Sequence, residues 1–292
     1  MAYVLHLSRM PELPEVDTIR RALEPLLRGE RLTEIEVLDP RIVQGDVAQL
    51  RVGALDRRVA EVMRRGKHLL FLLDGGKGIA LHLRMTGSLL LDEPEHSPRV
   101  RAILRFSNGT RLFFNDMRRL GTIMLVGDVE AYCHRLGPEP LCDDFTPAEL
   151  RRCMAGRRIS VKAALLDQHM VAGVGNMYAD EALFEARIHP LAPAGDLDFT
   201  QVQHLWVAIR AVLERAITAH GASISTYCLP NGDRGSAHDS FRVAHKNGVP
   251  CPVCGTPIDR VMVRKRGSYY CPKCQRLSER TTRGLKEVGG SD

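Results

Sequence analysis

The segment CPVCGTPIDRVMVRKRGSYYCPKC, residues 251–274, decides how the C-terminal part of the chain folds. Its cysteines Cys251, Cys254, Cys271 and Cys274 follow the pattern C-x₂-C-x₁₆-C-x₂-C. Two such pairs at this spacing predict a β-hairpin that holds one zinc ion through four thiolates. Four protein ligands leave no open position for a substrate, so the predicted zinc is structural. A redox-active C-x-x-C pair is the alternative, but it usually stands alone beside a βαβ pattern, which is missing here.

Positive charge is concentrated around the same segment. Residues 246–287 contain ten Lys or Arg and three Asp or Glu, whereas the whole chain has a net charge of +6. A compact basic region is typical of a surface that binds a polyanion, most often nucleic acid. A solvated basic surface explains the charge by itself equally well.

Length and composition indicate an ordinary globular chain. It has 292 residues, 44% hydrophobic and 26% charged, which predicts two domains and a small third one. No apolar run approaches the ~20 residues that a membrane-spanning helix needs, and residues 1–9 lack the features of a signal peptide. We therefore expect neither a membrane protein nor a secreted one, and a zinc ribbon fits a reducing cytoplasm.

Upstream of the zinc segment, the hydrophobic periodicity changes twice. Helical spacing predicts a first helix over residues 14–28, and alternating patterns with turn signals predict strands from 31 to 126. Helical periodicity returns after the N-cap residue Thr146. The expected fold class is α+β and multidomain: an N-terminal β-sandwich with one leading helix, a helical domain and a C-terminal zinc ribbon.

The predicted boundaries follow these changes. Residues 221–245 are irregular, and a loop of that length is usually functional or disordered. The turn Gly173-Val174-Gly175-Asn176 opens a helix, where backbone N–H groups can hold a phosphate; a simple connector is the alternative. The expected parts are a sandwich domain (10–130), a linker (131–145), a helical domain with the irregular loop (146–245), a zinc finger (246–276), and disordered ends (1–9 and 277–292).

Six motifs stand in order along the chain: MPELPEVD (10–17), RRGKHLL (64–70), HLRMTGSL (82–89), NDMRRLG (115–121), LGPEPL (136–141) and GVGNMYA (173–179). Together with the zinc segment, they resemble the formamidopyrimidine-DNA glycosylase family of base-excision repair. The resemblance covers about residues 10–276. It implies excision of oxidised purines, chiefly 8-oxoguanine and formamidopyrimidines, followed by β,δ-elimination of the abasic strand.

The same resemblance implies the architecture and the partners. The helical domain becomes a helix–two-turn–helix domain, and residues 221–245 become the lesion-recognition loop. The partner is double-stranded DNA with an oxidised base or an abasic site. The family also implies one structural zinc ion, a monomer, and a location in the cytoplasm with the nucleoid.

Four residues match the family's catalytic positions. Pro11 would be the nucleophile, because a chain-terminal proline is a secondary amine that can form an iminium with the sugar. Glu12 would protonate the sugar ring oxygen as general acid. Lys67 would hold a phosphate and assist elimination, with a solvated strand-end lysine as the alternative. Arg266 would contact phosphates at the zinc-finger tip and assist the second elimination.

Further residues match the family's DNA contacts. Met85, Arg118 and Leu120 would fill the space left by a flipped nucleotide, although core packing is the alternative for Met85 and Leu120. The family usually has Phe where this chain has Leu120, and a Tyr-Gly pair where it has Ala244-His245. Contacts to backbone phosphates are expected from Arg99 (a histidine in many members), Arg119, Arg157 with its neighbour Arg158, Lys162 and Asn176.

The N-terminus conflicts with the implied chemistry, because nine residues precede Met10. An internal proline is a tertiary amide and cannot act as a nucleophile. We therefore expect the functional start at Met10, with methionine removed from in front of Pro11.

Two other functions remain open at this point. An endonuclease VIII-like enzyme would act on oxidised pyrimidines, but that branch usually begins Pro-Glu-Gly-Pro, where this chain has Leu13 as the third residue of the motif. A non-catalytic lesion-binding protein is the second alternative, if residues 1–9 are retained. It would bind duplex DNA in a salt-sensitive way without cutting it.

Overall fold

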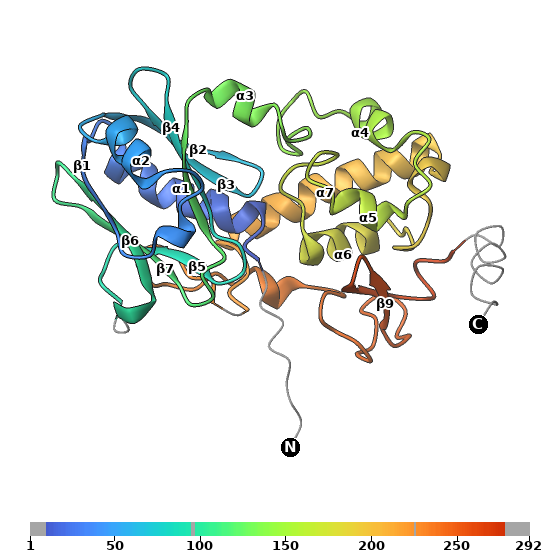
Figure 1. The fold of residues 1–292 in the computed structure, drawn as a ribbon. Helices are drawn as coiled ribbons and strands as arrows, with labels where there is room; N and C mark the ends of the chain where they lie inside the picture. Colours follow the sequence, from blue (N-terminus) through green and yellow to red (C-terminus); the bar gives the residue numbers. More distant parts are fainter. Residues whose placement is uncertain (1–9, 95–96, 225, 278–292) are drawn as a thin grey trace, which may run out of the picture. The chain divides into compact units, whose positions relative to one another are not determined.

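The computed structural model describes residues 10–94, 97–224 and 226–277. The expected disorder of residues 1–9 and of the tail from 278 onwards concerns positions outside these ranges. Contacts divide the chain into two compact units (Figure 1). Of the described residues, those from 10 to 135 and from 216 to 239 belong to unit 1, and those from 136 to 215 and from 240 to 277 belong to unit 2. Among the described residues, no helix has the length and apolar character required to cross a membrane.

Unit 1 is built on two four-stranded antiparallel sheets, in the orders β1-β6-β7-β5 and β2-β3-β4-β8. One apolar core takes buried residues from both sheets, so the predicted sandwich is confirmed. The rings of Phe71 and Phe106, one from each sheet, pack edge to face with centroids 6.4 Å apart. The strands are β1 (Leu32–Val37), β2 (Val59–Arg65), β3 (His68–Leu73), β4 (Gly78–His82), β5 (Gly87–Leu90), β6 (Val100–Phe106), β7 (Arg111–Asp116) and β8 (Thr122–Val126).

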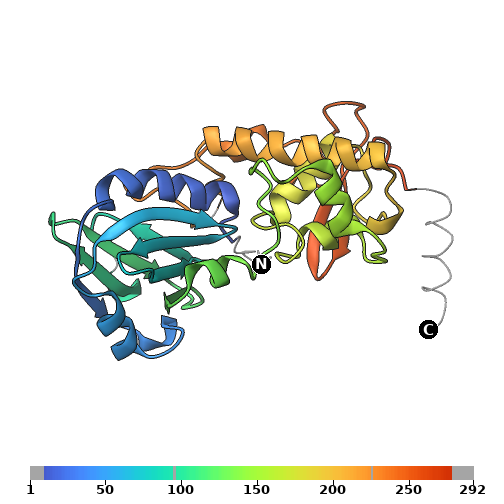
Figure 2. The ribbon, with the colours of Figure 1, turned by 90° about the horizontal axis from the view of Figure 1, so that it is seen from above.

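Helix α1 (Leu13–Leu27) is the predicted leading helix, and it packs against β2 and β3. In Figure 2 it is the blue helix beside the sheet. Its residues Val16, Ile19 and Leu23 repeat at helical spacing and are buried in the sandwich core, which explains why the helix forms there.

The prediction of one helix in this domain is wrong, because the structure contains two more short helices there. Helix α2 (Val47–Ala54) begins at Asp46, whose carboxylate accepts the N–H of Gln49 at 2.8 Å. Helix α3 (Val129–Cys133) contributes partly buried side chains to a small second cluster around Leu70 of β3. Both helices are short, so neither contains enough turns to produce a clear helical period. Single 3₁₀ turns occur at Pro40–Ile42 and Ser97–Arg99.

Unit 2 combines helices with a two-stranded hairpin. Thr146 caps the first helix by accepting the N–H of Glu149, as its sequence predicts. One 3₁₀ turn, Ala194–Asp196, lies before the longest helix, and another, Ala237–Ser240, lies after it and falls mostly among the residues of unit 1. The elements are α4 (Pro147–Met154), α5 (Val161–Leu165), α6 (Asn176–Glu185), α7 (Phe199–Thr218), β9 (Asp259–Val263) and β10 (Arg266–Tyr270).

Residues 216–239 group with unit 1 rather than with the helical unit in which the predicted boundaries place them. The side chain of Tyr227 explains this grouping, since it is 6% exposed and belongs to the sandwich core. Its hydroxyl donates to the carbonyl of His220 at 3.0 Å. Most of the expected recognition loop is therefore attached to unit 1.

Candidate functional site

Pro11 and Glu12 immediately precede helix α1, and both are buried. Glu12 is the N-cap residue, and its N–H donates to the carboxylate of Glu15 at 2.8 Å. This bond satisfies a backbone donor that a helix start would otherwise leave without a partner. The backbone at the predicted nucleophile is thus held in one direction by the first turn of the helix.

Lys67 lies in the tight turn between β2 and β3. Arg65 and His68 pair across this turn, and Gly66 has φ +58°, which favours glycine. Asp17 of α1 forms an ion pair with Arg64, with 3.6 Å between the carboxylate and Nε. This pair joins the helix that follows Pro11 to the end of β2. Lys67 itself is only 7% exposed, which argues against the solvated strand-end lysine.

A neutral histidine pair borders Lys67. His68 Nδ1 lies 2.7 Å from the hydroxyl of Tyr132, and the rings of His68 and His82 pack edge to face with centroids 4.5 Å apart. Burial is the main cause that lowers the pKa of His68 to about 4 and that of His82 to about 2, and the charge of Arg84 contributes to both values. Both imidazoles therefore remain uncharged at neutral pH, and the positive charge beside them comes from lysine and arginine.

Met85, Arg118 and Leu120 come from two loops of unit 1 that meet. Arg118 Nη1 lies 3.8 Å from Met85 Sδ, so the structure brings these two predicted residues together. Leu120 is 40% exposed, which does not fit core packing for this side chain. The group offers one cation and two flexible apolar side chains. A set of residues that replaces a base in a duplex requires this combination.

Asp116 organises both of these loops. Its carboxylate accepts the N–H of Arg118 at 3.1 Å and that of Gly121 at 2.7 Å, and it also accepts the hydroxyl of Thr86. The side chain is fully buried. Asp116 therefore ties the 116–121 loop to the segment that carries Met85. The sequence contains Asp116 within a quoted motif, but nothing in its spacing indicated this function.

The two other arginines of unit 1 that were predicted to contact DNA, Arg99 and Arg119, are both exposed, and their predicted roles stay predictions. Arg119 Nε contacts Asp39 at 3.2 Å, and Arg119 has φ +57°. The guanidinium of Arg41 beside Asp39 lowers the pKa of that carboxyl, so Arg119 faces a charged partner. Arg99 ends the 3₁₀ turn before β6 and is exposed.

In unit 2, the structure brings Asn176 to the zinc hairpin. Its Nδ2 donates to the carbonyl of Gly267 at 3.0 Å, next to the exposed Arg266. The hairpin tip is Arg264-Lys265, with φ +47° and +61°, values that arginine and lysine rarely adopt. Arg266 is one residue beyond this tip, at the start of β10. Arg157 and Arg158 are exposed elsewhere in the unit.

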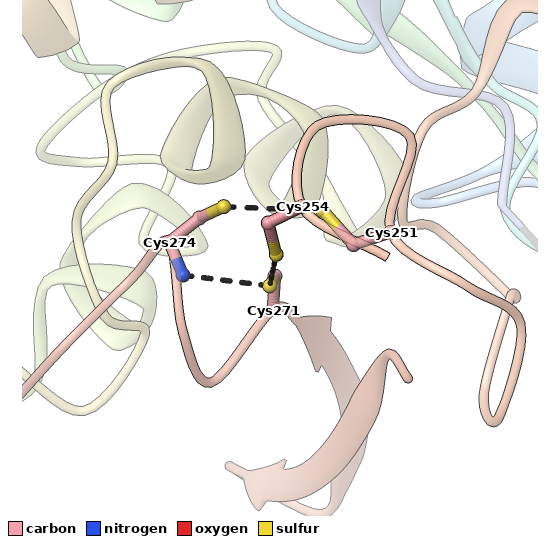
Figure 3. A group of neighbouring side chains, drawn as sticks. All are labelled: Cys251, Cys254, Cys271 and Cys274. Atoms are coloured by element: carbon pink, nitrogen blue, oxygen red, sulfur yellow. Dashed lines mark hydrogen bonds between the residues drawn. The ribbon is translucent and has the colours of Figure 1, made fainter. Parts of the chain in front are cut away.

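The four predicted zinc ligands converge on one point. Figure 3 shows Cys251 and Cys254 from the loop before β9 facing Cys271 and Cys274 after β10. All four sulfurs lie within 4.8 Å of one another, with 3.9 Å between Cys251 and Cys274 and 3.5 Å between Cys254 and Cys271. Zn–S bonds of about 2.3 Å in a tetrahedron place sulfurs about 3.8 Å apart. The residues fit one structural zinc ion.

The expectation that Lys162 binds a DNA phosphate is wrong. Its side chain is fully buried, and Nζ bonds the carboxylate of Asp180 at 2.5 Å. Burial raises the pKa of Asp180 to about 7, and the lysine ammonium opposes that rise. Lys162 is in α5 and Asp180 is in α6, so the pair joins two helices inside the unit. A lysine enclosed in this way cannot reach a ligand in solvent.

Replacing Lys162 with Met is expected to destabilise the protein by about 3–5 kcal/mol, because it leaves a buried carboxylate without its cation. The double variant Lys162→Met with Asp180→Asn should recover most of that loss, since no charge then remains buried. Urea unfolding followed by circular dichroism measures both. A single variant with unchanged stability but weakened, less salt-dependent DNA binding would instead restore the phosphate-binding role.

Glu181, which follows Asp180, is a second buried acid that the sequence analysis missed. Its carboxylate is 6% exposed and accepts the N–H groups of Arg242, Val243 and Ala244 at 2.8–3.0 Å. Ala244-His245, the pair that replaces the family's usual Tyr-Gly, therefore lies in a segment that is hydrogen-bonded to α6. Two adjacent acids inside an apolar helix were the available signal, because buried acids need partners.

Comparison with known proteins places these residues in context. Three family models match in succession: "Formamidopyrimidine-DNA glycosylase N-terminal domain" at residues 10–123, "Formamidopyrimidine-DNA glycosylase H2TH domain" at 136–228, and "Zinc finger found in FPG and IleRS" at 248–277. Curated relatives match across nearly their whole length. A formamidopyrimidine-DNA glycosylase of Chloroflexus aurantiacus is 44% identical over 271 residues, which are 91% of this chain and 98% of the relative.

Solved structures agree with the same assignment. The MutM (Fpg) protein of Thermus thermophilus superposes with a TM-score of 0.83 at 41% identity, covering 92% of this chain and all of that one. Lactococcus lactis Fpg, solved non-covalently bound to DNA with an abasic site, gives a TM-score of 0.82 at 33% identity, covering 91% of this chain and all of that one. A mutant of the same Lactococcus protein was solved with DNA containing Fapy-dG.

Proposed function

The chain belongs to the formamidopyrimidine-DNA glycosylase family, and from this premise we propose how its residues excise an oxidised purine from duplex DNA and cleave the abasic strand. The observation that supports the proposal most is the succession of the three family matches in order along the chain, between residue 10 and residue 277. The first match begins one residue before Pro11. DNA is the partner, and we propose a monomer that acts in the cytoplasm on the nucleoid.

The chemistry begins at the amine of Pro11. This nitrogen attacks the sugar carbon C1′ of the damaged nucleotide, and the glycosidic bond breaks with its electron pair leaving on the base; the proton that the nitrogen loses balances the one that the departing base gains. Glu12 gives a proton to the ring oxygen, so the sugar opens and an iminium joins Pro11 to C1′. Loss of a proton from C2′ then expels the 3′ phosphate, and a second elimination expels the 5′ phosphate. The buried position of Glu12 supports a proton donor that is shielded from water.

The remaining residues hold the duplex. Lys67 and Arg266 neutralise phosphates that flank the lesion. Asn176 contacts the DNA backbone close to Arg266. Arg118 hydrogen-bonds the unpaired base, while Met85 and Leu120 occupy the space left by the flipped nucleotide. Leucine stacks on a base less well than phenylalanine, so the wedge at Leu120 relies on shape more than on stacking. Arg99, Arg119 and Arg157 add exposed positive charge along the backbone.

Excision from two duplexes tests the substrate class. We expect release of 8-oxoguanine opposite cytosine to exceed release of thymine glycol opposite adenine by at least about tenfold, as a site built for one base rejects another. Single-turnover rates measure both. Faster release of thymine glycol would assign the chain to the endonuclease VIII-like branch. Tight binding to both duplexes without release of either base would indicate a non-catalytic lesion-binding protein.

A further inference from the structure

Glu15, in the first turn of α1, bonds two parts of unit 1 that are distant in the sequence. One carboxylate oxygen accepts the N–H of Glu12 at 2.8 Å, and the other accepts the N–H of Ala222 at 2.7 Å. The side chain is 1% exposed. A buried carboxylate that accepts two N–H groups in fixed directions makes strong, charge-assisted bonds.

Ala222 begins a loop that returns at Ser236, called here the 222–236 loop. Its two ends meet at a short neck, where Ala222 and Ser236 form a bridge and the N–H of Ala237 donates to the carbonyl of Gly221 at 2.9 Å. The neck is tightly packed, because a Cβ on Gly235 would lie 2.1 Å from the carbonyl oxygen of His220. Movement at the neck would therefore carry the whole loop with it.

The loop also reaches the residues proposed to enter the duplex. The hydroxyl of Thr226 lies 3.4 Å from the carbonyl oxygen of Met85, and the N–H of Leu91 donates to the carbonyl of Pro230 at 2.8 Å. The loop therefore contacts the segment that carries Met85 at its far side and Glu15 at its neck.

Gly221 fits the neck against Glu15 with no space to spare. It has φ +76°, and a Cβ there would lie 2.9 Å from Glu15 Oε1 and 3.1 Å from the ring of Tyr227. A side chain at this position would strain the backbone and push the carboxylate away from Ala222. Gly221 thus provides a way to disturb the loop end of the bridge while Glu15 itself is retained.

We infer that Glu15 is a positioning residue that sets the 222–236 loop and the backbone of Glu12 relative to each other. This inference rests on the proposed function and adds to it: one carboxylate aligns the part that reads the base with the part that attacks the sugar. A preformed abasic site has no base to read, so its cleavage depends on the Glu12 end alone. Excision of a damaged base depends on both ends.

Single-turnover rates on an 8-oxoguanine duplex and on a matched abasic duplex test the inference with two variants. Gly221→Ala is expected to slow base excision about tenfold, the loss equivalent to one well-placed hydrogen bond, and to leave abasic cleavage within about threefold. Glu15→Gln is expected to slow both reactions, because an amide cannot accept at both ends. Active protein is counted in each case by borohydride trapping on abasic DNA, which corrects for misfolded material.

Glu24→Gln is the matched control. Glu24 lies near the other end of α1 and also accepts a backbone N–H, that of Val62. We expect it to leave the ratio of the two rates unchanged. A Gly221→Ala variant that slows both reactions equally, or neither, would overturn the inference, and so would a Glu24→Gln variant that lowers base excision selectively. If the parent protein that begins at Pro11 cleaves neither duplex, the proposed function fails instead.

Discussion

Protein that begins at Pro11 is expected to be captured almost completely by borohydride on a duplex with one abasic site, whereas protein that keeps residues 1–10 is expected to give no adduct. The reason is the nitrogen of Pro11. As a chain terminus it is a secondary amine with a free electron pair, but behind a peptide bond that pair is delocalised into the carbonyl. Intact mass before the reaction identifies each N-terminus, and gel mobility after reduction measures the covalent complex.

The matched control is protein that starts at Pro11 and carries an N-acetyl group. It has the same chain and the same fold, but its nitrogen is an amide, so it should bind the abasic duplex without being trapped. Full trapping of protein that retains Met1 would exclude Pro11 as the nucleophile. The terminal amine of Met1 or a lysine would then form the imine, and Lys67 would be the first lysine to replace with methionine.

The second large effect concerns the zinc site. Changing Cys271 to Ser is expected to abolish stoichiometric zinc binding and to weaken binding to an abasic duplex by about 100-fold or more, because the free energy of structural zinc, about 10–16 kcal/mol in small fingers, is also folding free energy. Cys271 is fully buried and directly follows β10, the strand that carries Arg266. Loss of the hairpin would remove that cation and the acceptor of Asn176 together.

Zinc content by mass spectrometry and affinity by fluorescence anisotropy, at two salt concentrations, measure this effect. Cys142→Ser is the matched control, because Cys142 is exposed and outside the zinc group. It should keep one zinc ion and full affinity. A Cys271→Ser protein that lacks zinc but binds the duplex normally would show that the hairpin makes no contribution to DNA binding.

Much of the fold could be predicted because its signals are local. The alternating strands, the helix before them and the cap at Thr146 all depend on residues a few positions apart. Helices α2 and α3 were missed because each is too short for its period to stand out. The grouping of residues 216–239 with the sandwich was missed for another reason: it depends on where the ring of Tyr227 finds a core, and a sequence pattern does not contain that information.

The sequence by itself determined the zinc ligands and the motifs around Pro11, Lys67 and Asn176, because metal geometry and tight turns demand particular residues at set spacings. The tertiary structure alone decided which charged groups are available to a ligand. Lys162 looked like a phosphate contact until Asp180, eighteen positions away on another helix, was seen to enclose it. Glu15 stands in the first motif with nothing to indicate its contacts, yet one partner of its carboxylate is 207 positions along the chain. Burial and pairing of charges arise from distant segments meeting, and that is why only the folded chain reveals them.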